Sequence, residues 1–195
     1  MNRTLKYKLL YGALLALGGA GAAAIWIIFD LGVAGLLIAG VVFLVPPRIG
    51  GYFLRDLFLS RRYCTAGKYD EAIAAGERFL DTLERQPWRQ HLIYFFFGFY
   101  TWNTRAMALN NIGAAEMELG RLDAAEARLG EALGLDQDNP LPYYNLAVTA
   151  AALEDHQRSA HMLSRAAELG YERSTTDRAI SRVGDAYARY QSFPK

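Results

Sequence analysis

The sequence predicts an all-α protein in which an N-terminal transmembrane helical hairpin precedes an α-solenoid of about three helix pairs and a capping helix. Three observations lead to this prediction. Between residues 9 and 45 the only charged residue is Asp30, whereas the rest of the chain carries charge at ordinary density. That remainder also repeats itself at an interval of about 34 residues. We therefore assign residues 1–50 to the hairpin and residues 51–195 to a helical repeat domain.

The apolar segment is too long for one span, because a single helix over residues 9–45 would measure about 55 Å and a hydrocarbon core is about 30 Å thick. Two antiparallel helices over 9–29 and 31–46 fit better, with the turn at Asp30. A carboxylate in the middle of a membrane costs roughly 3 kcal/mol, so Asp30 belongs at the far interface, with Trp26 just inside it. The second helix is short. It must be tilted less, continue past its prolines or be supported by a partner.

Small residues recur at four-residue spacing in both helices of the predicted hairpin. They are Ala16, Ala20 and Ala24 in the first helix and Gly35 and Ala39 in the second. In lipid this spacing permits close approach of two backbones, so we expect the two helices to pack on each other. The alternative is alanine-rich filler without a packing role.

The first apolar stretch also resembles a cleaved signal peptide, in its basic start and in the small residues at 20–22. We favour an anchor, because the apolar sequence continues beyond this stretch for about another twenty residues, as a second span requires.

Positive charge flanks both ends of the hairpin and predicts its orientation. Basic residues near a span stay in the cytoplasm, so we expect both termini and the repeat domain there, with two spans in a bacterial inner membrane. These residues are Arg3, Lys6, Lys8, Arg48, Arg55, Arg61 and Arg62. The basic end also suits an anionic membrane surface. Residues 105–173 carry six arginines against eleven acidic residues, which argues against nucleic acid as a partner.

The repeat is clearest in the second half of the chain. Asn111 aligns with Asn145, the pair 112–113 with 146–147, and Leu129 with Leu163. A helical stripe follows the break at Gly120 and consists of Leu122, Ala125, Leu129, Ala132 and Leu133.

This spacing resembles the tetratricopeptide repeat family, here as a membrane-anchored bacterial member. The resemblance implies antiparallel helix pairs at about 53–86, 106–139 and 140–173. The first copy is weaker, because its second half matches the pattern at Gly67 and Phe79 but its first helix departs from it. A final helix at about 175–191 would cap the array with a polar outer face.

The resemblance also implies a groove on the first helices of the second and third copies, in which Asn111 and Asn145 would hold a peptide backbone. The basic clamp for a carboxylate is missing, so we expect a helix or an extended apolar peptide as the ligand. The alternative occupant is a segment of this same chain. The expected groove residues are Met107, Asn110, Asn111, Met117, Leu141, Tyr144, Asn145 and Val148.

An aromatic insertion at 87–105 separates the first copy from the second. Consecutive aromatic residues cannot all face one side of a helix, so part of the segment must be exposed or covered by something else. We expect it to contact membrane lipid or another membrane subunit; the alternative is packing on neighbouring repeats. Its aromatic residues are Trp88, Tyr94, Phe95, Phe96, Phe97, Phe99, Tyr100 and Trp102.

The sequence contains no pattern that predicts catalysis. His156 and His161 are five residues apart and do not share one helical face, His91 stands alone, and the single Cys64 forms no thiolate cluster. We expect no enzyme activity, no metal and no cofactor. The expected function is that of a scaffold and accessory subunit that stabilises an integral membrane complex. The alternatives are an assembly factor for such complexes, or a regulatory accessory of a membrane enzyme or secretion machine.

Overall fold

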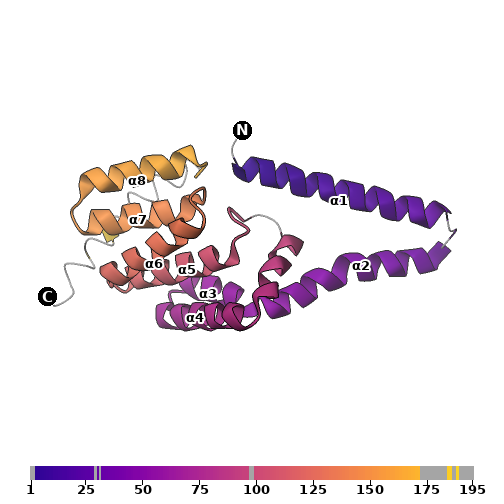
Figure 1. Cartoon of the computed structure of the whole chain (residues 1–195), viewed down its shortest axis with the longest axis horizontal. Coiled ribbons are helices and arrows are strands. Elements are labelled where there is room, and N and C mark those ends of the chain that lie inside the picture. The colour runs from indigo at the N-terminus through magenta and orange to yellow at the C-terminus, as the bar shows by residue number, and fades with distance from the viewer. Residues whose placement is uncertain are drawn as a thin grey trace.

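The computed structural model describes residues 3–28, 30, 32–96, 99–171, 184–185 and 188. Its regular structure is helical throughout these residues, which confirms the all-α class. A long hairpin of α1 and α2 projects from a group of stacked shorter helices (Figure 1). The helices are α1 (Arg3–Ile28), α2 (Gly32–Phe53), α3 (Arg55–Thr65), α4 (Tyr69–Arg85), the 3-10 helix η1 (Pro87–Phe95), α5 (Thr104–Glu118), α6 (Leu122–Leu135), α7 (Pro140–Ala152) and α8 (His156–Glu168).

The chain reverses between α1 and α2 at Asp30, where the sequence predicts the turn. Asp30 and Gly32 both have positive φ angles there, of 44° and 51°. The second helix continues past its two prolines as far as Phe53, which is one of the solutions expected for its short apolar stretch. Pro46 and Pro47 lack a backbone N–H and interrupt the hydrogen-bond ladder of α2, which bends along its course (Figure 1). No helix among the described residues combines the length and the apolar character needed to cross a membrane.

The two helices of the hairpin meet near their turn and diverge away from it (Figure 1). Ala16, Ala20 and Ala24 on α1 are exposed, and only Gly35, close to the turn, is buried. In this structure the alanines of α1 do not contact α2, because the two helices diverge before reaching them. The side chain of Ala39 lies outside the described residues.

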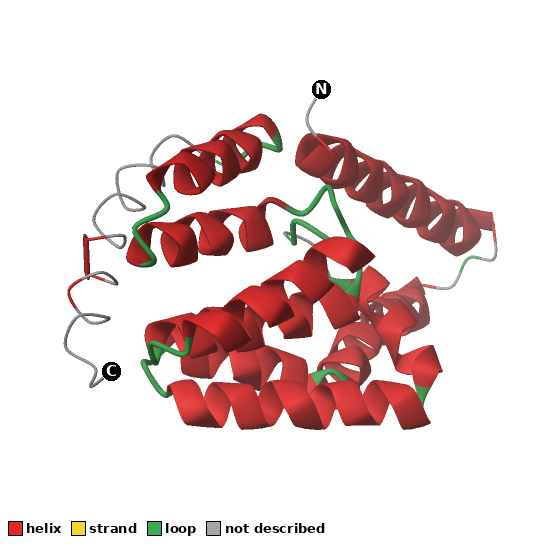
Figure 2. Cartoon of the chain, turned by 60° about the vertical axis from the view of Figure 1, so that its left-hand side comes forward, coloured by secondary structure: helices red, strands yellow, loops and turns green. Residues whose placement is uncertain are grey.

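Three antiparallel helix pairs, α3/α4, α5/α6 and α7/α8, stack in chain order (Figures 1 and 2). The first and third pairs lie within the ranges 53–86 and 140–173 in which the sequence places a repeat, and the second begins at Thr104, two residues before its range of 106–139. The expected capping helix lies outside the described residues except at 184–185 and 188.

The turns inside the three pairs share one backbone geometry. Gly67, Gly120 and Glu154 have positive φ angles of 72°, 75° and 63°. In each turn the next residue donates its N–H to a carbonyl five positions back, as Arg121 does to Glu116 at 2.9 Å. This bond pattern closes the C-terminus of a helix and requires a left-handed residue.

Glycines allow the helices to approach closely. A Cβ at Gly113 would lie 2.7 Å from Cγ of Leu129 across the α5/α6 pair, and one at Gly76 would lie 2.5 Å from Cγ1 of Ile112 between neighbouring pairs. Neither position has room for a larger side chain.

The second helices of the pairs are joined by ion pairs. Arg128 on α6 donates to Glu77 on α4 at 2.5 Å, and Arg158 on α8 donates to Glu126 on α6. This second bond is the chief cause that raises the pKa of Arg158 above its ordinary value. All four side chains are partly exposed, so each pair contributes about 0–1 kcal/mol and mainly fixes the register of the stack.

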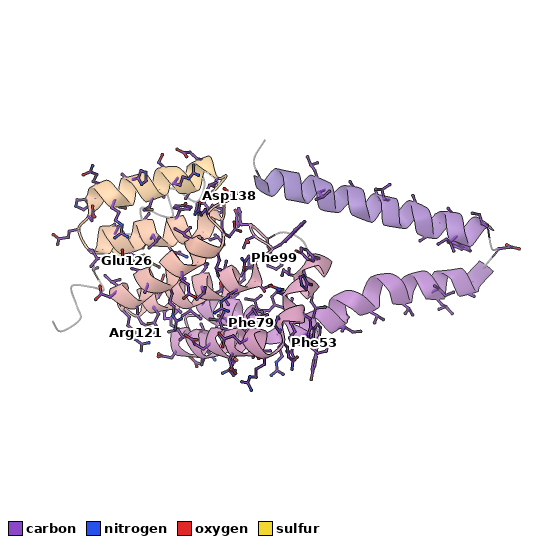
Figure 3. The ribbon with its side chains drawn as sticks, viewed as in Figure 1. Phe53, Phe79, Phe99, Arg121, Glu126 and Asp138 are labelled. Atoms are coloured by element: carbon purple, nitrogen blue, oxygen red, sulfur yellow. The ribbon has the colours of Figure 1, made fainter. Side chains whose placement is uncertain are left out.

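The interior consists of two apolar clusters. The larger joins α3, α4, η1 and α5 around Phe79, Leu109 and Ile112, and the smaller joins α5 to α8 around Tyr144 and Val148. Figure 3 shows Phe79 inside the stack and Phe53 where the stack joins α2. The predicted stripe of α6 is confirmed, since all its members are buried except the half-buried Leu133.

Candidate functional site

The predicted groove residues lie on α5 and α7, and the structure buries five of the eight. The buried ones are Asn110, Met117, Tyr144, Asn145 and Val148. Met107, Asn111 and Leu141 are half-buried. In this structure α5, α7 and their partner helices pack together through Met117, Tyr144 and Val148, so these three predicted groove residues contribute to the core.

Asn145 has an internal partner. Its Nδ2 donates to Oδ1 of Asn110 on the neighbouring helix at 3.0 Å, and both side chains are buried. Asn111, which the repeat aligns with Asn145, instead accepts a hydrogen bond at its backbone carbonyl from the thiol of Cys64, at 3.4 Å. The side-chain amide of Asn145, which was expected to hold a peptide backbone, thus links α7 to α5.

Part of the predicted groove borders a cavity of about 530 Å³ between α3, α4, α5 and α7. Leu141, Tyr144 and Asn145 line it, together with tyrosines and carboxylates that the sequence did not indicate. Tyr69 donates to Glu118 at 3.3 Å across this space, and the ring of Tyr171 lies 4.6 Å from that of Tyr144. Asp185, from the range of the expected capping helix, also lines the cavity. The cavity is therefore aromatic and acidic, whereas the sequence predicted an apolar groove with amides.

The aromatic insertion divides into an inner and an outer group. In the inner group, Phe96 and Phe99 pack against Phe58 of α3, with ring centroids 5.1 Å and 6.1 Å away. Trp102 also packs against the larger core cluster, and Tyr100 is half-buried near Tyr171. These aromatic residues therefore pack on the neighbouring repeats, which was the alternative to contact with lipid or another subunit.

The outer group consists of Trp88 and Tyr94, whose side chains are 50% and 52% exposed. Trp88 lies edge-on to Phe53 at 5.2 Å, and the guanidinium of Arg89 lies 5.0 Å from the centre of the Phe53 ring. Arg89 also donates to the backbone carbonyl of Phe53 at 3.3 Å. The insertion therefore joins the end of α2 to the repeat domain. A run of consecutive aromatic residues in the sequence does not by itself predict this role. The side chain of Phe95, and Phe97 as a whole, lie outside the described residues.

Comparison of the chain with protein-family models, with curated proteins and with solved structures found no match.

Proposed function

We propose that the chain is a non-catalytic, membrane-anchored scaffold of the tetratricopeptide type, an accessory subunit that stabilises an integral membrane complex from its cytoplasmic side. One observation carries the proposal: large apolar side chains are exposed along both helices of the hairpin. Leu17, Ile28, Val33 and Leu37 are 71%, 74%, 76% and 69% exposed. Burying one such side chain is worth about 1.5–3 kcal/mol, so this surface favours an apolar environment.

The orientation of the hairpin follows from charge. Arg48, Arg55, Arg61 and Arg62 are exposed around the end of α2 and along α3, where the hairpin joins the repeat domain. Exposed arginines at this place favour the cytoplasmic surface, where anionic headgroups lie. The exposed Trp88 and Tyr52 stand beside the same junction and have the side chains preferred at a membrane–water interface.

The helix pairs support the binding role. Stacked pairs contact mainly their neighbours in sequence and leave extended surfaces for other proteins. The common turn geometry and the interval of about 34 residues between the second and third pairs support the tetratricopeptide type.

The anchor can be tested by alkaline extraction of membranes that carry the full chain. The double variant Leu17→Lys, Leu37→Lys should move the protein from the membrane pellet to the extract, because each lysine costs roughly 3 kcal/mol in lipid. The matched control is Leu135→Lys, Leu153→Lys, which alters two exposed leucines of the repeat domain and should leave the protein in the pellet. Extraction of the unaltered chain under the same conditions would refute the anchor.

The role as a subunit is tested by purification in mild detergent. A permanent subunit brings its complex with it in fixed stoichiometry, whereas an assembly factor recovers substoichiometric and changing clients. A regulatory accessory would change the activity of the recovered enzyme or secretion machine without being needed for its assembly. Recovery of the chain alone, from membranes in which it is abundant, would refute the scaffold.

A further inference from the structure

The last turns of α2 and the whole of α3 share one continuous outward face. The buried residues of this stretch recur at helical spacing through the junction of the two helices, as Gly50, Leu54, Leu57 and Ser60. The N–H of Leu54 donates to the carbonyl of Gly50, and that of Phe58 to Leu54, so helical hydrogen bonding passes from α2 into α3. The face opposite the buried residues therefore also runs along both helices.

This outward face changes from apolar to basic along its length. On the hairpin side it carries Val41 and Val45, which are 60% and 41% exposed. Beyond them an exposed arginine recurs at every seventh position, and the exposed Tyr52 lies between the first two. Seven residues return to nearly the same side of a helix, because two turns take about 7.2 residues. The arginines are Arg48, Arg55 and Arg62.

The described part of the chain does not neutralise these three arginines. None of them makes an ion pair with a described carboxylate. Asp56, the only carboxylate of α3, lies 3.7 Å from Arg78 of α4 instead. Arg61 is not part of the face, because its guanidinium lies over the ring of Phe99, 5.8 Å from the ring centre. The outward face therefore carries positive charge that a bound anion can offset.

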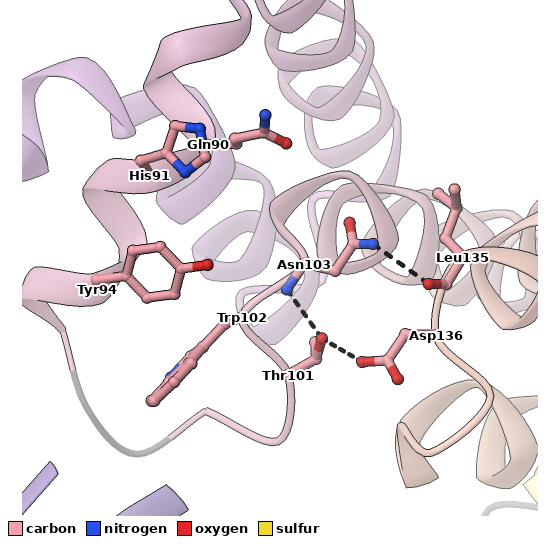
Figure 4. Close-up of a pocket in the computed structure, with 8 residues that line it drawn as sticks. All are labelled: Gln90, His91, Tyr94, Thr101, Trp102, Asn103, Leu135 and Asp136. Atoms are coloured by element: carbon pink, nitrogen blue, oxygen red, sulfur yellow. Dashed lines mark hydrogen bonds between the residues drawn. The ribbon is translucent and has the colours of Figure 1, made fainter. Parts of the chain in front are cut away.

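The 3-10 helix η1 adds an aromatic ring beside this face. Trp88 lies edge-on to Phe53 at 5.2 Å, and Phe53 lies edge-on to Tyr52 at 5.5 Å. On its other side η1 meets the repeat domain, where Tyr94 lies edge-on to Trp102 at 5.3 Å beside a cavity of about 360 Å³. Figure 4 shows this cavity and the hydrogen bonds that join the segment before α5 to the end of α6. Helix η1 thus contacts both α2 and the repeat domain, and it places Trp88 next to the basic face.

We propose that the outward face binds an anionic phospholipid, with the phosphate between Arg48 and Arg55 and an acyl chain along Val41 and Val45. Arginine can donate two parallel hydrogen bonds to phosphate oxygens, and the valines on the hairpin side favour a hydrocarbon chain. Tyr52, between the two arginines, has a ring of the kind preferred at a membrane–water interface. This inference rests on the membrane anchor proposed above and names the lipid that its cytoplasmic end contacts.

The geometry also determines which arginines a lipid can reach. The headgroup layer on each side of the hydrocarbon core is about 5–7 Å thick. Side chains of a helix lean toward its N-terminus, so Arg55, at the start of α3, leans back toward α2 and the membrane. Arg62 lies about 10 Å further along α3, beyond this layer. A lipid therefore uses Arg48 and Arg55, whereas an acidic protein segment along the whole face would use all three arginines.

The test is a competition between two lipids for the full chain, purified in an uncharged detergent. Dioleoyl phosphatidylglycerol and dioleoyl phosphatidylcholine are added in equal amounts, and native mass spectrometry counts the lipids that remain bound. We expect at least a fivefold preference for phosphatidylglycerol, because phosphatidylcholine carries a cation of its own beside the phosphate. Arg48→Gln, Arg55→Gln should reduce this preference to less than twofold. The control Lys68→Gln, Arg165→Gln removes the same charge at two exposed positions of the repeat domain and should keep the preference.

Single variants cover the case in which the double variant fails to fold. Arg48→Gln and Arg55→Gln should each lower the preference at least twofold, and Arg62→Gln should leave it unchanged. Equal retention of the two lipids by the unaltered chain, an unchanged preference in both single variants, or an equal loss in the control would overturn the proposal. If no lipid were preferred and a co-purifying protein were lost from all three single variants, the face would bind an acidic protein segment instead.

Alkaline extraction separates this proposal from the anchor on which it rests. The double variant Arg48→Gln, Arg55→Gln keeps every apolar residue of the hairpin, so it should stay in the membrane pellet as the unaltered chain does. If both stay in the pellet and no lipid is preferred, the lipid site is refuted and the anchor is not. If the unaltered chain is extracted, the anchor is refuted, and the lipid site with it.

Discussion

The turns inside the three helix pairs require a left-handed residue, and the chain supplies glycine at two of them, Gly67 and Gly120, but a glutamate at the third. An L-residue with a side chain pays roughly 1–2 kcal/mol for this conformation, because its Cβ approaches the following carbonyl oxygen. Glu154 has this strained conformation at the position of the third pair that corresponds to Gly120. The backbone hydrogen bonds of its turn follow the same pattern as those at Gly120.

Replacement of Glu154 by glycine should therefore raise the free energy of unfolding by about 0.5–1 kcal/mol, the relief of strain less the added freedom of the unfolded chain. Gly120→Ala should lower it by about 1 kcal/mol. Urea unfolding of the full chain in detergent measures both. Glu154→Ala is the control, since it removes the side chain but keeps the strain. If the glycine and alanine variants were equally stable, backbone strain would not be the cause.

The bond between Asn110 and Asn145 gives a second prediction for single residues. Asn145→Leu leaves a buried amide oxygen of Asn110 without its donor and should lower the free energy of unfolding by about 1–3 kcal/mol. Asn110→Leu added to it should restore part of this loss, because apolar groups of similar shape replace both partners. Urea unfolding of the single and double variants gives the coupling energy. Independent, additive losses would contradict the internal role and favour the peptide-holding role that the family resemblance implies.

The helix pairs could be predicted from the sequence because their determinants are local and repeat. Gly120, the α6 stripe from Leu122 to Leu133 and the small residue at Gly113 each act within one pair. The groove could not be predicted equally well, because burial of Tyr144 and Val148 depends on how closely successive pairs stack. The repeat aligns Asn111 with Asn145, but this alignment does not predict that the side chain of Asn145 is hydrogen-bonded to Asn110.

The aromatic insertion acts as an element in its own right, joining the hairpin to the repeat domain. A Cβ at Gly50 of α2 would lie 3.1 Å from the Phe96 ring, and that ring in turn packs on Phe58 of α3. A 3-10 helix could not be predicted for this segment, because its aromatic residues recur with neither a helical nor an alternating period. The side that each ring faces is decided by α2 and α3, which lie far from it in the sequence.

Phe96→Ala should consequently destabilise the chain by about 2–4 kcal/mol, somewhat less than the loss of a fully buried phenylalanine, because Phe96 is half-buried. Hydrogen exchange should also quicken over residues 50–58, where α2 meets α3. Tyr94→Ala, two positions away and half-exposed, is the control and should cost less than about 1 kcal/mol. Equal losses in the two variants would mean that Phe96 does not hold this junction.

The hairpin and the repeat domain are joined directly and not through a linker. The N–H of Leu54 donates to the carbonyl of Gly50 and that of Phe58 to Leu54, so hydrogen bonding passes from α2 into α3 with only a turn residue between them. Figure 1 shows α2 leading directly into the stack. A hairpin inserted in a membrane would therefore orient the repeat domain at its surface, and would not merely tether it.

This orientation can be tested by labelling cysteines in intact cells with a maleimide that does not cross membranes. The native Cys64 is first replaced by serine, and a single cysteine is then placed at the exposed Asp30, in the turn before α2, or at the exposed Arg48, in the second half of α2. Because the basic residues beside Arg48 should remain in the cytoplasm, Asp30→Cys should react in intact cells and Arg48→Cys only after lysis. Both should react fully in detergent, which shows that neither thiol is hidden by the fold. Labelling of Arg48→Cys but not Asp30→Cys in intact cells would invert the orientation. Labelling of neither in intact cells, with both reactive after lysis, would place the whole hairpin inside the cell and refute the two spans.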